Sequence, residues 1–425
     1  MNKRAFGIAV LLAIVLFYAL GTGFPFFYRF LYVLILLMGI GAVWSWANLR
    51  GIEIKVTRTA DRGVVGSYLE GLVSITNRTV MPKSWLEVAE ATGPSADGSG
   101  SGVSLVRNQT RSWKIETYLS KRGVYRSGLV QVLSQDPFGL FRFLRNFIDS
   151  QTYIVYPATE PLPNLDRRFA GLPSDSRVTR HWDQITTDVA SIREYQPDDG
   201  FRRIHWPYTA KMNSLMVKEF DIGISAEAWV VLDMNDASHF GIEAASVNNT
   251  EELAVSTAAS IVNRLVDLEV SVGLAATGDR HHLHRPDSSP EHLGRLMEIF
   301  AEVRASGLTP LREYLYEVQS HLNQFNTVTV VTASADTNWL SSLAALRGRG
   351  VDVAAVVIDQ AGFGAGSNVG STLAAASANL VPVYVVRRGA RIDDCLNSPV
   401  NRDDIIGSPR YGGSPGYAMR MTDRT

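Results

Sequence analysis

Residues 228–238 read AWVVLDMNDAS, an apolar run of five residues that ends at Asp233. A continuous apolar run bounded by polar residues predicts a strand buried on both faces, which is typical of a parallel sheet covered by helices. Further strands are expected at residues 270–276, 327–331, 351–358 and 381–386, and helices at 251–268, 292–305, 311–322 and 339–347. This alternation predicts a doubly wound α/β domain with parallel strands over residues 221–400.

The preceding region, residues 51–160, has the shorter period of β-strands. Ile52, Ile54 and Val56 alternate with charged residues, as in a strand with one buried face. Similar short runs recur at residues 72–75, 85–88, 112–118 and 129–132, and a Gly/Ser-rich tract at 93–102 separates two of them. Short strands at this spacing predict a β-rich, sandwich-like domain or a barrel.

The first fifty residues contain two apolar runs without a charged side chain, at 5–20 and 30–49. About 20 apolar residues are needed to cross the hydrocarbon core of a bilayer. Lys3 precedes the first run and Arg50 follows the second, which by the positive-inside rule favours both outer flanks in the cytoplasm. We therefore expect a two-helix transmembrane hairpin over residues 1–50, in the inner (cytoplasmic) membrane, with the soluble body in the cytoplasm. A signal peptide is the alternative interpretation of the first run.

Composition excludes several classes of function. The 425 residues include 41 basic and 42 acidic side chains, so the net charge of -1 gives no overall electrostatic reason to bind nucleic acid. The single cysteine, Cys395, excludes an intrachain disulfide framework and a Cys-rich zinc module. The loop at 362–366 (GFGAG) lacks both the dinucleotide fingerprint and the P-loop lysine, so no bound nucleotide is expected. The Gly-, Ser- and Pro-rich residues 401–425 are expected to form a disordered tail.

Three motifs together resemble one bacterial family. They are Arg122-Gly123-Val124-Tyr125, Asp136-Pro137-Phe138-Gly139-Leu140-Phe141, and residues 193–206, which read REYQPDDGFRRIHW. On these motifs the chain resembles the domain of unknown function 58 family, over most of its length. The resemblance implies a membrane hairpin, a β-rich region and a von Willebrand A-like (Rossmann-like) α/β domain. It also implies a partner role beside MoxR-type AAA+ ATPases and transglutaminase-like membrane proteins, without an established chemistry.

The chain departs from the family pattern at two positions. The glycine that usually follows the signature proline is Asp198, and the basic residue that usually follows the tryptophan is Pro207. Both positions lie in the connecting segment, residues 161–220. A role for this loop therefore does not carry over from the family without a test on this chain.

The resemblance implies a metal site at the carboxyl edge of the α/β sheet. In von Willebrand A domains a DxSxS motif begins at such a strand end and helps to hold Mg²⁺ through oxygen ligands. Here Asn235 keeps an oxygen at the first hydroxyl position, whereas Ala237 offers none at the second. A degenerate Mg²⁺ site is therefore expected at Asp233, Asn235, Ser238, Thr332 and Asp336, with Asp236 and Thr277 as further oxygen donors. In the alternative interpretation, Asp233 only caps the next helix.

The connecting segment supplies a second candidate site, in which basic and acidic residues surround Trp206. In one hypothesis it is a recognition surface whose arginines bind the carboxylates or phosphates of a partner. In the other it is an internal ion-pair network between the two domains, with Trp206 as an apolar plug. In either case the residues expected to matter are Tyr195, Asp199, Arg202, Arg203 and Trp206.

The leading functional hypothesis is a membrane-anchored interaction or scaffold protein that is not an enzyme. It would present its α/β domain to a MoxR-type ATPase, in the assembly or maturation of a membrane or envelope complex. The alternative is a cell-envelope hydrolase or transferase that uses Asp198, Asp199 or His205 as acid–base groups. A third possibility is a purely structural scaffold without metal dependence. For Cys395 a structural role is expected, since no histidine follows it in the sequence.

Overall fold

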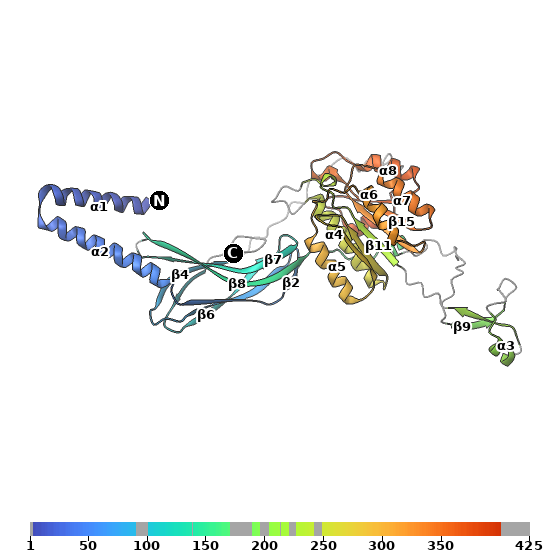
Figure 1. Ribbon diagram of the computed structural model, residues 1–425, viewed down its shortest axis with the longest axis horizontal. Coiled ribbons are helices and arrows are strands. Elements are labelled where there is room, and N and C mark those ends of the chain that lie inside the picture. Colours follow the sequence, from blue (N-terminus) through green and yellow to red (C-terminus); the bar gives the residue numbers. More distant parts are fainter. Residues whose placement is uncertain are drawn as a thin grey trace, which may run out of the picture. The chain divides into compact units, whose positions relative to one another are not determined.

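The computed structural model describes residues 3–90, 101–137, 139–170, 189–195, 204–212, 214–220, 227–241 and 249–400. The chain divides into two compact units, Met1–Ala158 with Met297–Glu302, and Thr159–Leu296 with Val303–Thr425. An N-terminal apolar helix precedes mixed sheets and helices (Figure 1), which confirms the expected multi-domain α/β organisation. The finer division at residues 50, 160, 220 and 400 stays a prediction, and the tail predicted at 401–425 lies outside the described residues.

Two helices open the first unit, α1 (Lys3–Thr22) and α2 (Pro25–Asn48) (Figure 1). Pro25 lies in the first turn of α2, where its missing N–H leaves no hydrogen bond unmade. Among the described helices, α2 is the one whose length and apolar composition suit a membrane span. The apolar part of α1, Val10–Thr22, is shorter. One helix able to cross a membrane is therefore present, and the second span stays a prediction.

Two β-sheets follow the helices in the first unit, and residues of both line its larger apolar core. The smaller sheet has the order β1–β3–β6 and is antiparallel, with β1 Ile52–Arg58, β3 Tyr68–Asn77 and β6 Thr110–Tyr118. The larger has the order β2–β8–β7–β4–β5, with β2 Arg62–Val64, β4 Lys83–Glu90, β5 Ser101–Leu105, β7 Gly123–Gln135 and β8 Arg142–Tyr156. Alternate residues of both sheets meet in the core, including Ile54, Val73, Leu86 and Val132. Apolar and polar residues alternate along these strands because each sheet buries one of its two faces.

A six-stranded sheet of order β13–β12–β11–β14–β15–β16 lies at the centre of the second unit. Five strands run parallel: β11 Glu227–Leu232, β12 Ser271–Ala276, β14 Asn326–Thr332, β15 Asp352–Ile358 and β16 Val383–Val386. The five strands expected from the apolar runs have therefore formed. The edge strand β13 (His282–Asp287) pairs antiparallel with β12 and was not expected.

Helices cover both faces of this sheet (Figure 1). On one face α6 (Leu311–Val318), α7 (Trp339–Gly348) and α8 (Val369–Ala378) pack against Trp229 and Val231 in a single apolar core. The alternate residues of β11, among them Val230, are buried outside that core, and α4 (Thr250–Asp267) contacts the same strands. Two further helices are α5 (Pro290–Glu302) and α9 (Ile392–Leu396). This burial of both strand faces explains the continuous apolar runs.

The order of the sheet creates a switch point between β11 and β14. From β11 the chain passes to β12 on one side and later returns to β14 on the other side. Loops that follow such strands diverge at the carboxyl edge, which is where open α/β sheets place their ligands. Asp233 and Thr332 stand at these two strand ends.

The described residues between 189 and 220 of the connecting segment form a small substructure. The strands β9 (Val189–Glu194) and β10 (Met216–Phe220) pair antiparallel, and α3 (Trp206–Met212) lies between them in the sequence. A bridge between Ile204 and Val217 extends the pairing. We refer to residues 189–195, 204–212 and 214–220 as the signature lobe.

Candidate functional site

Asp233 joins the ends of β11 and β14 through a buried carboxylate. Its side chain has no exposed surface, and Thr332 Oγ1 donates a hydrogen bond of 2.6 Å to Oδ2. Oδ1 accepts a hydrogen bond of 3.1 Å from the backbone N of Asn235. Thr332 Oγ1 in turn accepts from Ser334 N at 2.9 Å. The two residues predicted to meet at the sheet edge therefore do meet, and each satisfies the other's hydrogen-bonding capacity.

Asn235 and Ser238 take part in the loop that follows β11. Asn235 Oδ1 accepts from Ala237 N at 2.9 Å and caps the short helix η3 (Asp236–Ser238), while its Nδ2 donates to Thr309 O at 2.9 Å. The residue that caps this short helix is therefore Asn235, two residues after Asp233, and not Asp233 itself. Ser238 is buried, and its carbonyl accepts from Gln360 Nε2 at 3.2 Å.

Asp336 is exposed and serves the start of α7. Its Oδ1 accepts a hydrogen bond of 3.1 Å from Asn338 N, and its carbonyl accepts one of 2.7 Å from Trp339 Nε1. The described residues contain no group of three or more His, Cys, Asp or Glu side chains arranged to hold a metal ion. A cation at Asp233 would have to replace the hydrogen bond from Thr332, and Ala237 would supply no ligand. Magnesium binding at this edge stays a prediction.

Two further buried polar residues lie beside Asp233: His239, which the sequence did not indicate, and Thr277, which it did. His239 Nε2 lies 2.8 Å from the carbonyl oxygen of Asp233, and because a carbonyl only accepts, this nitrogen must carry the proton. Its Nδ1 lies 3.2 Å from Thr250 Oγ1, at the start of α4. On the other side, Thr277 Oγ1 accepts from Met234 N at 2.7 Å. A single histidine six residues after Asp233 carries too little pattern to indicate this contact.

Buried amides lock the loops that follow β14 and β15. Gln360 Nε2 donates to Ala333 O at 2.5 Å, and Asn368 Nδ2 donates to the same carbonyl at 3.0 Å and to Ile358 O at 3.3 Å. Residues Gln360–Phe363 form a short 3₁₀ helix, η5, that ends at Gly364 in the left-handed conformation. The glycine-rich loop therefore ends this short helix at Gly364, beside the hydrogen-bonded loops. These hydrogen bonds join the loop that follows β14 to the loop that follows β15.

The signature lobe exposes its tryptophan. Trp206 is 61% exposed, and Met212 and Leu215 are 54% and 43% exposed. His205 Nδ1 accepts a hydrogen bond of 3.1 Å from Tyr208 N at the start of α3, so the histidine acts as a helix cap. The recognition surface and the internal network with Trp206 as its plug both stay predictions for this segment. Tyr195 is half-buried and its N donates to Leu215 O at 2.8 Å, whereas Asp198, Asp199, Arg202 and Arg203 lie outside the described residues.

Cys395 is half-buried in α9, and burial raises the pKa of its thiol above the usual value of 9.0. Because the thiolate is the reactive form, we expect alkylation of Cys395 by iodoacetamide to be slower at neutral pH than that of a free cysteine. The rate should keep rising with pH beyond 9.0, since the raised pKa delays ionisation. Mass spectrometry of the alkylated protein over a pH series measures this. A midpoint below that of free cysteine would contradict it and revive a nucleophilic role.

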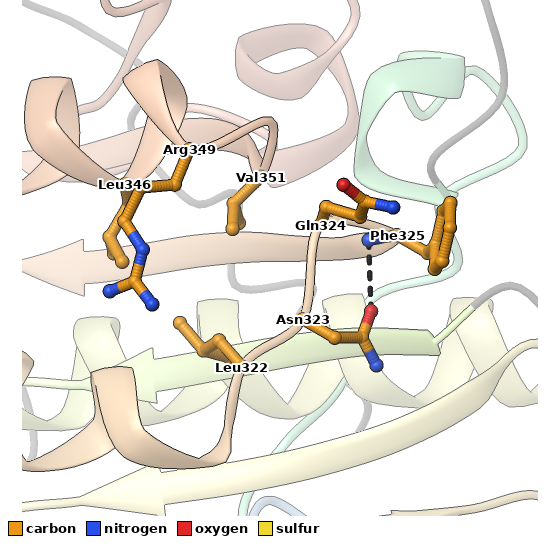
Figure 2. Close-up of a pocket in the computed structure, with 7 residues that line it drawn as sticks. All are labelled: Leu322, Asn323, Gln324, Phe325, Leu346, Arg349 and Val351. Carbon is orange, nitrogen blue, oxygen red and sulfur yellow. Dashed lines mark hydrogen bonds between the residues drawn. The ribbon is translucent and has the colours of Figure 1, made fainter.

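A shallow cavity of about 360 Å³ lies at the amino edge of the sheet, opposite the site described above. It is lined by residues that precede β14 and β15: Leu322, Asn323, Gln324, Phe325, Leu346, Arg349 and Val351 (Figure 2). Asn323 Oδ1 is already used by Phe325 N at 2.9 Å. Gln324 and Arg349 are the other polar residues of the lining, beside the apolar Leu322, Leu346 and Val351.

A single family match covers both the signature segment and most strands of the α/β sheet. The family described as "Protein of unknown function DUF58" matches residues 191–363. The uncharacterized protein YeaD of Bacillus subtilis (strain 168) is 24% identical over 214 residues, 50% of each chain, so the chain spans about half the length of this curated relative.

Solved structures resemble only parts of the chain. The CARDB domain of the PF1109 protein from Pyrococcus furiosus has a TM-score of 0.20 and 13% identity, over 24% of this chain and 91% of that chain. The C-terminal domain of wzt has a TM-score of 0.20 and 12% identity, over 26% and 75%. At such scores neither likeness bears on fold or function.

Proposed function

Since the chain belongs to the DUF58 family through residues 191–363, a family of unknown function, we propose a role from its own geometry. It is a membrane-anchored protein-interaction scaffold in the assembly or maturation of a membrane or envelope complex. In this proposal α1 and α2 form the membrane anchor. The α/β unit is a von Willebrand A-like domain that lies in the cytoplasm. The proposed partner is a MoxR-type AAA+ ATPase, or a transglutaminase-like membrane protein.

The exposed apolar side chains of the signature lobe carry the proposal. Trp206, Met212 and Leu215 fall within ten residues of one another in the sequence and all are exposed. Tryptophan offers a large, rigid contact area with one hydrogen-bond donor, and is enriched among the residues that dominate binding energy at interfaces. A surface tryptophan with neighbouring apolar residues therefore favours the recognition hypothesis over the internal network.

The carboxyl edge of the sheet has a supporting part in this proposal. The carboxylate of Asp233 already accepts hydrogen bonds from Thr332 and Asn235. The side chains of Gln360 and Asn368 join the neighbouring loops by hydrogen bonds. Such an edge keeps its shape when a partner binds, which limits the conformational entropy lost on association. We propose that recognition depends on the lobe and on this rigid support, and not on magnesium at Asp233.

Trp206→Ala is expected to lower recovery of the partner by about tenfold or more, because truncation of a central tryptophan commonly weakens binding by about 2 kcal/mol. The test is affinity purification of the detergent-solubilised full chain, with co-eluting proteins identified by mass spectrometry. Tyr316→Ala is the matched control, since Tyr316 is an aromatic residue of the α/β unit that is 79% exposed. Each sample is prepared with Mg²⁺ and with a chelator.

Three outcomes count against the proposal in different ways. Equal recovery from Trp206→Ala and the parent would remove the lobe from the interface. An AAA+ ATPase recovered only with Mg²⁺, and lost on Asp233→Ala but not on Trp206→Ala, would restore the metal hypothesis. Absence of any ATPase or transglutaminase-like protein from the parent sample would contradict the proposed partners.

A further inference from the structure

Only three residues separate the membrane helix from the first strand. The helix α2 ends at Asn48 and β1 begins at Ile52. A fully extended chain spans at most about 3.5 Å per residue, so Ile52 lies within about 14 Å of Asn48. Gly51 makes the sharp turn with φ of 64°, and a Cβ at this position would overlap the methyl group of Thr79. The connection therefore has neither the length nor the freedom of a linker.

Side chains clamp the helix end to the strands. Asn48 is fully buried, and its Nδ2 donates to Ser84 O at 2.6 Å and to Ser134 Oγ at 3.0 Å. Lys83, 2% exposed, donates from Nζ to Ala47 O at 2.8 Å and so caps the last turn. If α2 spans the membrane, these contacts hold the adjoining end of the β-rich region at the bilayer surface.

Two turns gather at this same end, residues 78–82 and 106–109, which we name the membrane-proximal turns. Arg78 N donates to Gly51 O at 2.8 Å, and Asn77 Nδ2 donates to Met81 O at 2.9 Å and to Val106 O at 3.2 Å. Val80 and Val106 are 71% and 62% exposed in these turns. Turn positions usually carry polar residues, so apolar side chains here suit the bilayer interface better than water.

Three arginine side chains belong to the same end of the β-rich region. The guanidinium carbon of Arg50 lies 3.6 Å from the centroid of the Trp46 ring, and Arg145 Nη1 donates to Leu49 O at 3.1 Å. Arg107 is exposed in the second turn. In the part of the chain that the structure describes, no ion pair engages these three arginines, whereas Glu53 is bound by Arg78 at 2.8 Å. The end of the unit thus offers positive charge with apolar neighbours.

We propose that this end of the β-rich region is a binding surface for anionic phospholipid headgroups, in the leaflet from which α2 emerges. Val80, Val106 and Trp46 enter the interfacial layer, and Arg50, Arg107 and Arg145 bind the phosphates. The inference rests on the proposed anchoring by α2. With 24 residues, α2 is about 36 Å long, whereas the hydrocarbon core is about 30 Å thick, so the helix end reaches the headgroup layer.

Depth in the bilayer is the first test. Single cysteines, Val80→Cys and Val106→Cys, are introduced into the full chain with Cys395→Ser and labelled with an environment-sensitive fluorophore in nanodiscs that contain spin-labelled lipid. We expect a blue shift and strong quenching at both positions. The control is Ala60→Cys, an exposed position just beyond the far end of β1, where neither is expected. Equal quenching at all three positions, or at none, would overturn the inference.

Lipid composition is the second test. The protein is reconstituted with phosphatidylcholine mixed with phosphatidylglycerol, and the lipids that it retains are counted by native mass spectrometry. We expect enrichment of phosphatidylglycerol, reduced about fivefold by Arg50→Gln or Arg107→Gln, the effect typical of one arginine at an anionic surface. Arg126→Gln, an exposed position toward the other end of β7, should leave it unchanged.

A separate measurement distinguishes this inference from the proposed anchor. If the chain resists extraction from vesicles by alkaline carbonate but shows no quenching at residues 80 and 106, α2 is an anchor and the lipid surface is wrong. If alkaline carbonate releases the chain, the anchor itself is wrong. Equal retention of both lipids by the inserted protein contradicts the preference for anionic headgroups.

Discussion

Asp233→Ala is expected to lower the free energy of unfolding of the α/β unit by about 3 kcal/mol. The substitution removes a buried carboxylate that accepts hydrogen bonds from Thr332 Oγ1 and Asn235 N, and it leaves these donors without their acceptor. Hydrogen bonds to charged groups contribute about 1.5–3 kcal/mol each, and a buried donor left unsatisfied adds to the loss. Urea unfolding of the full chain in detergent, followed by tryptophan fluorescence, measures the change.

Asp336→Ala is the matched control, because Asp336 is an exposed aspartate that follows the next strand of the same edge. It caps a single backbone N–H, so a loss of about 1 kcal/mol or less is expected. Repeating both titrations with Mg²⁺ separates a structural carboxylate from a metal ligand. A structural carboxylate gives the same destabilisation in both buffers. A parent protein that Mg²⁺ stabilises, with the gain lost in Asp233→Ala, contradicts this interpretation.

Asn48→Ala is expected to destabilise the junction of α2 with the β-rich region by about 3 kcal/mol. The substitution removes three hydrogen bonds at a fully buried position: two donated by Nδ2, to Ser84 O and Ser134 Oγ, and one that Oδ1 accepts from Ser84 N at 3.1 Å. Each buried group left without a partner costs about 1–3 kcal/mol. Hydrogen exchange of the full chain in nanodiscs should show much faster exchange in peptides that contain Ser84.

The control for Asn48 is Asn146→Ala, an exposed asparagine on β8. It should leave the exchange of Ser84 unchanged. Faster exchange in both variants would indicate general destabilisation of the β-rich region. Protection of Ser84 in Asn48→Ala would show that the clamp does not depend on this side chain, and would weaken the argument that the region is fixed at the membrane surface.

Several elements of the fold could be predicted from local pattern alone. The apolar runs at β11, β12, β14, β15 and β16 are buried on both faces, and such strands need no partner sequence to be recognised. The edge strand β13 escaped prediction because it is exposed on one side and contains His282, His284 and Pro286. The helix α8 escaped because its run of Ala, Ser and Gly residues has little periodic contrast.

The candidate site divides in the same way. The topology rule for parallel sheets was enough to place Asp233 and Thr332 at one edge, since the carboxyl ends of parallel strands lie together. The sequence could not show whether their oxygens are available to a cation, because that depends on which hydrogen-bond donors and acceptors lie next to them in the folded chain. His239, Gln360 and Asn368 belong to the same network, yet their residue types occur throughout ordinary loops.

Length and hydrophobic period, which act within a few residues, were sufficient for the apolar helix and the strands of the parallel sheet. Contacts between residues distant in the sequence settled the rest. Thr332 reaches Asp233 across 99 positions, and Asn77 brings Val106 beside the end of α2. The residues next to Trp206 in the sequence do not indicate whether its side chain is buried or exposed. Burial and hydrogen bonding depend on what the folded chain places nearby, and no local pattern records that.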